Sequence, residues 1–316
     1  MKNSVVVTGN MGYLGPIVVR KLHQAGYVVA GVDPNIYEAE LPFEYRADIQ
    51  VPGIEQLPRI FWDCKSVVHL AAISNDPMGE LDESLTYQTN VRLVAELCDA
   101  FPEARHVLAS SASVYGFSDL NCIESDPLNP LSTYASSKIA AEKIVNLLNP
   151  SSISLRFGTL WGASPNFRVD LMVNHFVLEG LVDKVIAPTS NSRRPILHVS
   201  DAAKAIVDAV DSNPEHYHGV YNVTGENVNV YEVASKIAAF MNVDVKLDPD
   251  KSDADKRSYH AATMREPHFS SGTAIKVGDE THMNQLITCA GANLKAPPRI
   301  EALKRLLAER SATVYD

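Results

Sequence analysis

Residues 4–15 read SVVVTGNMGYLG, and this stretch decides the fold. Residues 4–8 are a short apolar run, typical of a strand that is buried on both faces. A glycine turn follows, and residues 16–25 have helical periodicity. Glycine lets backbone N–H groups approach a pyrophosphate at the positive end of a helix, so the stretch predicts a dinucleotide-binding loop. The loop comprises Gly9, Asn10, Met11, Gly12, Tyr13, Leu14 and Gly15.

The same alternation of apolar runs and helical patterns continues through the first half of the chain. It predicts strands at 27–33, 66–72, 106–110 and 153–157, and helices at 85–101 and 133–148. Strands that alternate with helices form a parallel sheet with right-handed crossovers. The fold class is therefore α/β, with a Rossmann-type doubly wound sheet.

The alternation loosens after residue 158. A helix is expected at 201–211, a strand at 220–224, and helices at 230–241 and 299–309, whereas residues 248–285 are polar without a clear period. We expect residues 1–165, joined by 190–225, to form the dinucleotide-binding domain. Residues 166–189 and 226–316 would then form a smaller, C-terminal substrate-binding α/β domain.

Composition narrows the class of protein. The formal net charge is -10 and the pI about 5.5, which disfavours a nucleic-acid partner because such proteins carry a basic face. None of the four cysteines belongs to a CxxC pair, so we expect neither a metal site nor a disulfide framework. The sequence shows no signal peptide and no membrane-spanning stretch, which predicts a cytoplasmic protein that does not bind membranes.

Acidic residues near the loop indicate which dinucleotide binds. Asp33 ends the second strand, about 20 residues past the loop, where a carboxylate accepts hydrogen bonds from the adenosine ribose. The same charge repels a 2′-phosphate, so NAD is favoured over NADP. Asp48 and Ile49 fall where the adenine edge could be contacted. Three glycines in a GxxGxxG spacing could instead form a structural turn, and either aspartate could be a solvated loop residue.

Three polar residues form a candidate catalytic set. Tyr134 and Lys138 lie four residues apart in the predicted helix 133–148, so both side chains share one face. A neighbouring ammonium, together with the positive nicotinamide ring, is expected to lower the pKa of the phenol, which would let it take a proton from an alcohol. Ser111 follows a strand at its carboxyl end, where open α/β sheets bind ligands. The alternative is a surface tyrosine beside a solvated lysine, and an incidental serine.

These motifs occur together in one order. The set comprises TGNMGYLG, Asp33, HLAA (69–72), SSASVYG (110–116), YASSK, RFGTLWG (156–162) and RPILHVSD (194–201). As a set it resembles the extended short-chain dehydrogenases, and more narrowly the NAD-dependent epimerase/dehydratase family that includes UDP-galactose 4-epimerase. The resemblance spans roughly residues 4–240.

The resemblance implies roles for individual residues. NAD would be held through the glycine loop, Asp33 and Lys138, with Leu70, Ala71 and Ala72 lining it. Ser111 and Tyr134 would lie at the reacting hydroxyl. Dehydratases of the family carry an acidic pair where this chain has Ala112 and Ser113, so a 4,6-dehydratase is not expected. The segment 261–290 departs from the family pattern.

Substrate contacts are also implied by position. Arg194 resembles the family's diphosphate-binding arginine, whose guanidinium fork matches phosphate oxygens, and Arg257 resembles a second one. Thr159 and Asn174 fall at substrate-facing positions, and Ser74, with the adjacent Asn75 and Asp76, could line the sugar site. Each could equally cap, pack or lie in a loop. We expect His198 to be structural and His175 to lie on a helix surface.

Two enzymatic functions and one non-enzymatic function fit this sequence. The first is a nucleotide-sugar 4-epimerase that works through a transient 4-keto sugar. The second is an NAD(H)-dependent nucleotide-sugar dehydrogenase or keto-sugar reductase. The third is a non-catalytic NAD-binding regulator, since a fold does not fix a function. The family commonly pairs through two long helices, here 85–101 and 133–148, so a homodimer is expected.

Overall fold

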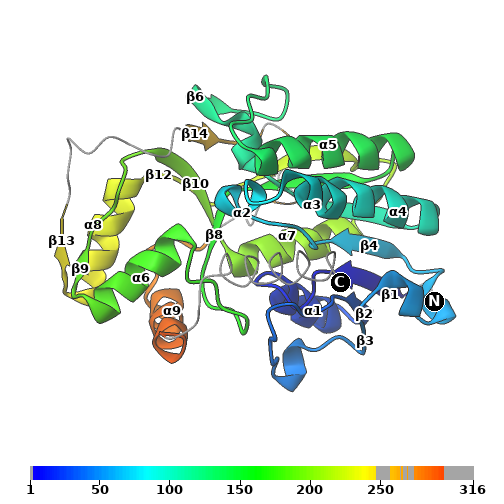
Figure 1. The fold of residues 1–316 in the computed structure, drawn as a ribbon, viewed down its shortest axis with the longest axis horizontal. Helices are drawn as coiled ribbons and strands as arrows, with labels where there is room; N and C mark the ends of the chain where they lie inside the picture. The colour runs from blue at the N-terminus through cyan, green and yellow to red at the C-terminus, as the bar shows by residue number, and fades with distance from the viewer. Residues whose placement is uncertain (1–2, 247–256, 264, 266–268, 270–273, 295–316) are drawn as a thin grey trace, which may run out of the picture.

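The computed structural model describes residues 3–246, 257–263, 265, 269 and 274–294. Its main element is a seven-stranded sheet with the order β11-β7-β5-β4-β1-β2-β3 (Figure 1). Every pairing within this sheet is parallel. Strands β2 and β3 are added on one side of β1, and β4 and the later strands on its other side, so the strand order reverses between β1 and β4. The predicted Rossmann-type sheet is confirmed. Its strands are β1 Ser4–Thr8, β2 Val28–Val32, β3 Ile49–Val51, β4 Ser66–His69, β5 Arg105–Ser111, β7 Ile153–Phe157 and β11 Gly219–Val223.

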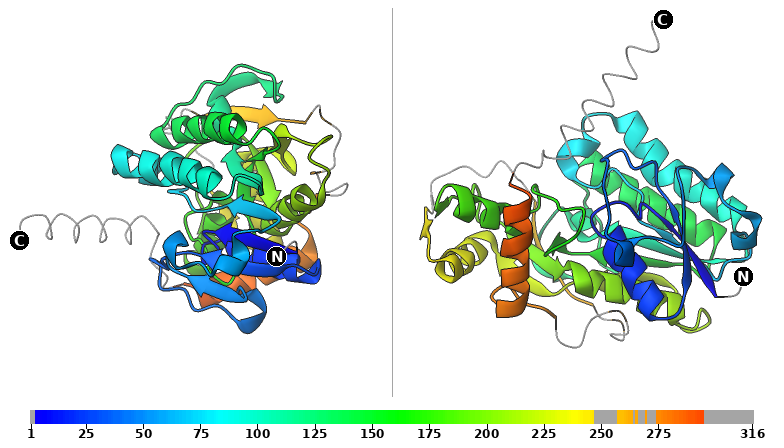
Figure 2. Two further views of the ribbon diagram at one scale, coloured as in Figure 1. Left: turned by 90° about the vertical axis from the view of Figure 1, so that its right-hand side faces the viewer. Right: turned by 90° about the horizontal axis from the view of Figure 1, so that it is seen from below.

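Helices cover both faces of this sheet, as Figures 1 and 2 show. The first face packs against α1 (Gly15–Gln24) and α7 (Val199–Asp211), and the second against α4 (Leu93–Ala100) and α5 (Thr133–Leu148). Strand β1 shows why its sequence lacks alternation. Val5 and Val7 belong to the core on one face and Val6 to the core on the other, and all three are fully buried.

A second hydrophobic core lies on the side of β8 and β10 that faces away from the seven-stranded sheet. It joins a three-stranded sheet, β12-β10-β8, to three helices, and includes Trp161, Phe176, Ile196, Ile237 and Leu286. The elements are β8 Thr159–Trp161, α6 Met172–Val182, β10 Arg193–His198, β12 Glu226–Asn229, α8 Val230–Met241 and α9 Glu280–Ala292, with the pair β9 Val185–Ile186 and β13 Asp244–Val245. The predicted domain boundaries stay a prediction, which this separate core supports.

Some elements differ from the sequence-based expectation. The helix expected at 85–101 is divided into α3 (Glu83–Tyr87), a π-helical turn η4 (Gln88–Arg92) and α4. The polar region 248–285 includes β14 (Ser258–Ala261), which pairs with β6 (Phe117–Cys122), and the start of α9. The short elements are η1 Phe43–Tyr45, η2 Ile54–Gln56, η3 Arg59–Phe61, α2 Asp76–Gly79 and η5 Ala112–Tyr115.

Two predictions depend on which residues are described. The helix expected at 299–309 lies outside the described residues. Within the described part of the chain, the search for a helix with the length and hydropathy of a membrane span finds none.

Candidate active site

The turn between β1 and α1 is pressed against the strand end that follows β4. Gly9 has a φ of +70°, and a Cβ there would lie 2.5 Å from the amide nitrogen of Ala71. A Cβ on Gly15 would lie 2.5 Å from the backbone of Asn10. Real Cβ atoms do not approach backbone this closely, so only glycine fits at either position. The turn therefore brings Leu70, Ala71 and Ala72 beside the loop.

The amino end of α1 is suited to an anion. Leu14 occupies the N-cap and makes no side-chain capping bond, and the first turn carries no acidic residue. The first N–H groups of a helix lack partners within the helix, and the helix dipole adds partial positive charge there. Together with the glycine turn, this end forms a cradle into which a pyrophosphate fits.

The structure places Asp33 against this loop. Its carboxylate accepts hydrogen bonds from the backbone N–H of Met11 (3.1 Å) and of Asn35 (2.7 Å). A carboxylate has lone pairs for further donors, so it can also receive ribose hydroxyls. Asn10, by contrast, is fully buried and donates to Gln50 at 2.5 Å. Its side chain therefore anchors the loop to β3.

Asp48 lies at the other end of the sheet from the loop. Its carboxylate accepts from the N–H of Val29 at 2.7 Å and contacts His23 at 3.0 Å, and Ile49 follows it at the start of β3. The residue that pairs beside Asp33 is Val51, whose carbonyl accepts from the Asp33 N–H at 3.0 Å. The adenine-edge role of Asp48 and Ile49 stays a prediction, and the register places Val51 closer to that position.

The structure brings Ser111, Tyr134 and Lys138 together at the carboxyl end of β5. Ser132 caps α5 and starts the helix so that Tyr134 lies in its first turn. The Tyr134 hydroxyl lies close enough to Ser111 for that side chain to lower the Tyr134 pKa. The Lys138 ammonium donates to the Ala109 carbonyl at 2.9 Å and lies 5.7 Å from the centroid of the Tyr134 ring. Both side chains are buried, with exposed fractions of 9% and 4%.

Burial dominates the electrostatics of this set. It raises the pKa of Tyr134 to about 12, although the nearby Ser111 side chain opposes the rise. Burial also lowers the pKa of Lys138 to about 8, against the attraction of Glu142. The protein alone therefore does not lower the Tyr134 pKa, because removing the phenol from water outweighs the lowering by Ser111, Arg168 and Arg257.

The residues after Ser111 carry no acid. Ser111 caps η5 by accepting from the Ser113 N–H at 3.2 Å, and its oxygen also accepts from the Ser113 hydroxyl at 2.9 Å. Ala112 and Ser113 are both buried. Neither side chain can shuttle a proton at neutral pH.

A buried ion pair borders this site, and the sequence patterns missed it. Arg168 binds Asp170 through two bonds, at 3.0 and 2.5 Å, and donates to the Ser74 hydroxyl at 3.1 Å. Asn75 donates to the same Asp170 carboxylate at 2.8 Å. Burial alone would raise the pKa of Asp170, but Arg168 holds it at about 2. The only sequence signal was an Arg-x-Asp triplet within a cluster of turn residues.

The two predicted diphosphate-binding arginines lie together. Arg194 on β10 is buried and donates to the carbonyls of Arg193, at 2.8 Å, and of Arg257. The Arg257 guanidinium pairs with Asp76, which also accepts from Ser132 at the start of α5. This chain of contacts ends beside Tyr134, because α2 packs on α5 and a Cβ on Gly79 would lie 3.1 Å from that of Tyr134.

Asn174 occupies a position that differs from the expected substrate contact. It is fully buried on α6, accepts from the Gly162 N–H at 3.1 Å, and donates to the Arg168 carbonyl at 2.9 Å and the Tyr13 hydroxyl at 3.3 Å. Tyr13 in turn donates to the Gly162 carbonyl at 2.6 Å. Asn174 and Tyr13 thus join the glycine loop to residues 162–168.

The remaining candidates fall at the edge of the site or outside it. Thr159 begins β8, half-buried beside Ile196 of β10. His198 is structural, since it accepts from the Ser200 N–H at 3.2 Å to cap α7 and burial lowers its pKa to about 3. His175 is exposed on α6, 3.5 Å from Glu179.

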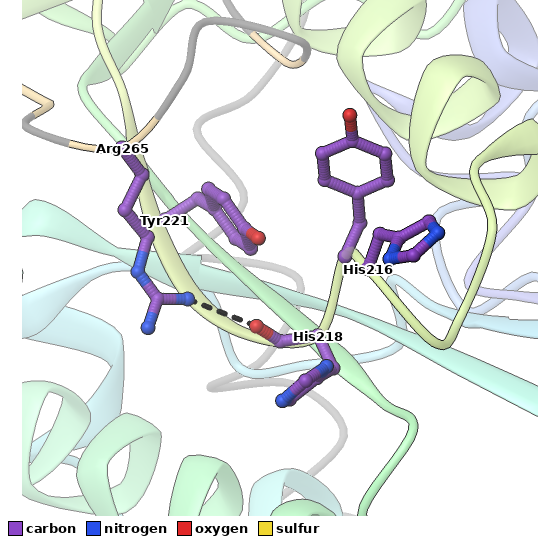
Figure 3. A pocket seen from close by; sticks show the side chains of 5 residues that line it. His216, His218, Tyr221 and Arg265 are labelled. Carbon is purple, nitrogen blue, oxygen red and sulfur yellow. Dashed lines mark hydrogen bonds between the residues drawn. The ribbon is translucent and has the colours of Figure 1, made fainter.

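Two surface hollows lie along β11. The first, of about 310 Å³, is lined by His216, Tyr217, His218, Tyr221 and Arg265 (Figure 3). Arg265 donates to the His218 carbonyl at 2.9 Å, and its guanidinium lies 4.8 Å from the Tyr221 ring centroid. The second, of about 520 Å³, shares Arg265 with the first. Neither hollow is lined by Ser111, Tyr134 or Lys138, so the catalytic set lies elsewhere.

Comparisons with known proteins agree with this geometry. The model of the NAD dependent epimerase/dehydratase family matches residues 5–224. A dTDP-4-dehydrorhamnose reductase of Aggregatibacter actinomycetemcomitans is 28% identical over 243 residues, which cover 74% of this chain and 77% of that protein. A UDP-glucose 4-epimerase of Streptomyces lividans is 26% identical over 270 residues, covering 75% and 80%. The structure of MoeE5 in complex with UDP-glucose and NAD aligns with a TM-score of 0.76 and 25% identity, covering 92% of this chain and 100% of MoeE5.

Proposed function

Since the chain belongs to the NAD dependent epimerase/dehydratase family, we propose that it is a nucleotide-sugar 4-epimerase that works through a transient 4-keto sugar. One observation carries this proposal. Tyr134 is buried beside Ser111, and the Lys138 ammonium lies 5.7 Å from the centroid of its ring, at the carboxyl end of the strands where the glycine loop also lies.

NAD is the cofactor of this family, and the residues of the loop fit it. The backbone from Gly9 to Gly15 and the amino end of α1 would hold the pyrophosphate, and Asp33 the adenosine ribose. Residues 70–72 would line the cofactor, and Lys138 would bind it beside Tyr134. Bound there, NAD would supply the acceptor, and later the donor, of a hydride at the sugar carbon.

The protein's own residues manage the proton. Ser111 holds the reacting hydroxyl through its side-chain oxygen, and Tyr134 takes the hydroxyl proton and later returns it. With a pKa of about 12, Tyr134 is protonated at neutral pH. Taking a proton therefore requires added positive charge, part of which the Lys138 ammonium supplies.

The substrate side follows from the two arginines. Arg194 and Arg257 would bind the diphosphate of the nucleotide sugar, which requires Arg257 to exchange Asp76 for phosphate oxygens. Thr159 and Ser74 border the space between these arginines and Tyr134. Ala112 and Ser113 disfavour elimination of water, so we do not propose a 4,6-dehydratase.

The second candidate is a keto-sugar reductase. A phenol that is protonated at rest is poised to donate a proton to a keto oxygen, which is what a reductase needs from it. The similarity to a dTDP-4-dehydrorhamnose reductase also favours this reaction. The homodimer, the cytoplasmic location and the absence of a nucleic-acid partner stay predictions.

One assay separates the two candidates. Purified protein is incubated with NAD and UDP-glucose, UDP-galactose, UDP-glucuronic acid or dTDP-glucose, and products are resolved by chromatography. Formation of the 4-epimer without net change in nicotinamide absorbance supports the epimerase. Stoichiometric consumption of NADH with a nucleotide-linked 4-keto sugar supports the reductase, and no turnover of any of these compounds would count against both.

A further inference from the structure

Tyr259 is a buried phenol that no motif in the sequence indicated. It lies on β14, between the paired strand β6 and the neighbouring strand β10. Its exposed fraction is 4%, lower than that of Tyr134. Its ring lies 6.4 Å from that of Tyr115, and the Arg194 guanidinium lies 5.7 Å from its centroid.

Tyr259 lies beside the candidate active site. The charges and phenols close enough to shift its pKa are Arg194, Arg257, Asp76 and Tyr134. Burial raises the pKa of Tyr259 well above its usual value, so the hydroxyl keeps its proton and remains a hydrogen-bond donor. These neighbours come from β10, the start of β14, α2 and α5, so the phenol lies where the four elements converge.

The Tyr259 hydroxyl has no hydrogen-bond partner among the residues that the structure describes. Buried tyrosine hydroxyls normally have one. The neighbouring Tyr115 shows the usual case, because its hydroxyl donates to Asn222 at 2.8 Å and accepts from Arg156 at 2.9 Å. A protonated donor that has no partner among the described residues, and that lies close enough to Tyr134 for that phenol to raise its pKa, is placed to bind a ligand.

We propose that Tyr259 is a specificity-determining residue whose hydroxyl donates a hydrogen bond to the sugar ring of the substrate. The proposal rests on the function proposed above. The Arg194 guanidinium lies 5.7 Å from the centroid of the Tyr259 ring, and Arg257 and Tyr134 are also among its neighbours. Only the sugar joins a diphosphate bound at the arginines to the hydroxyl that reacts at Tyr134, so the contact is with a ring substituent between them.

The test removes the proposed hydrogen bond in two ways, by deleting the Tyr259 hydroxyl and by deleting single hydroxyls of the sugar. The dissociation constants of UDP-glucose, its 2-, 3- and 6-deoxy analogues and UDP are measured by calorimetry for the wild type and for Tyr259→Phe, both loaded with NAD. The wild type should bind one deoxy analogue about tenfold more weakly than UDP-glucose, as for the loss of one buried hydrogen bond. Tyr259→Phe should bind UDP-glucose about tenfold more weakly, not distinguish it from that analogue, and bind UDP as the wild type does.

Tyr115→Phe is the matched control, because it removes a hydroxyl from the same cluster. It should lower the melting temperature by breaking the bonds to Asn222 and Arg156, and leave the ranking of the analogues unchanged. Tyr259→Phe should melt with the wild type, since no described residue loses a partner.

The outcomes separate the inference from the function on which it rests. If the wild type binds UDP-glucose but Tyr259→Phe ranks the analogues as the wild type does, the inference is wrong and the proposed function stands. The same holds if the wild type binds every deoxy analogue as tightly as UDP-glucose. If the wild type binds none of these nucleotide sugars, both are overturned. Binding without turnover overturns only the reaction.

Discussion

The two sides of Tyr134 are built in different ways. On the cofactor side, backbone is pressed against backbone, as where Gly9 meets Ala71, and the polar groups on offer are peptide N–H groups. On the substrate side, the polar groups are charged side chains that are buried or half-buried, with Arg168 on Asp170 and Arg257 on Asp76. A backbone cradle depends on shape and suits a dinucleotide of constant structure. A set of side-chain charges can change by single substitutions, which suits a substrate that varies within a family.

The largest expected effect lies where the two sides meet. Tyr134→Phe removes the only group in the catalytic set placed to exchange a proton with the sugar hydroxyl. Because general acid–base catalysis contributes about 10²–10⁴-fold, we expect kcat to fall by about 10³-fold while the affinity for NAD is retained. Steady-state kinetics and a cofactor titration measure the two. Full activity in this variant would refute the mechanism, whereas NAD binding without any turnover by the wild type would favour the non-catalytic regulator.

The substrate side should depend on its buried charges. Asp170→Asn leaves the Arg168 guanidinium buried without its counter-charge, which we expect to cost about 3 kcal/mol of unfolding free energy. Glu96→Gln is the control, because it breaks an exposed pair with Arg92 and should cost less than about 0.5 kcal/mol. Urea denaturation gives both values. Equal losses in the two variants would show that burial of the Arg168–Asp170 pair has no energetic consequence.

The cofactor side should depend on the absence of side chains. Gly15→Ala introduces a Cβ 2.5 Å from the Asn10 backbone, so the turn has to shift away from the pyrophosphate cradle. We expect about a 100-fold weaker affinity for NAD, since several N–H contacts are displaced together. Gly291→Ala is the control, because a Cβ on that residue of α9 meets nothing within 4 Å. It should leave cofactor affinity unchanged.

The contrast between the sides also explains what the sequence could and could not reveal. The sheet was predictable because each strand and helix carries its own apolar pattern. The pairing of Tyr134 with Lys138 was predictable because one helical turn brings them onto one face. Arg168 and Tyr259, which the sequence did not reveal, come from segments far apart in the chain, and β14 reaches the site by pairing with β6, which no local period encodes.

The pKa of Tyr134 could not be predicted from the sequence for the same reason. The sequence shows that an ammonium lies one turn from Tyr134, but not how much of the phenol other segments remove from water. That burial reverses the expected direction of its pKa shift. The π-helical turn Gln88–Arg92 was likewise hidden inside an uninterrupted helical pattern.

Acid should weaken the substrate side selectively. The folded pKa of Asp170 is about 2, below its ordinary value of 3.8. The stabilisation is therefore complete above the unfolded pKa and is lost as the pH falls through the folded one. About 2 kcal/mol of the difference between wild type and Asp170→Asn should disappear between pH 5 and pH 2. A difference that stays constant across these urea titrations would mean that Asp170 is not held ionised by Arg168.

The smallest expected effect concerns the connection between the two sides. Tyr13→Phe removes the hydrogen bonds from the glycine loop to the Gly162 carbonyl and to Asn174, at a cost of about 1 kcal/mol. If residues 162–168 keep Arg168 in place through this contact, the variant should also raise KM for the nucleotide sugar several-fold with little change in kcat or in NAD affinity. Tyr45→Phe is the control, because its hydroxyl accepts only from the exposed Arg20 among the described residues. If Tyr13→Phe loses stability without any change in KM, the hydrogen bonds of Tyr13 stabilise the fold but do not position the substrate side.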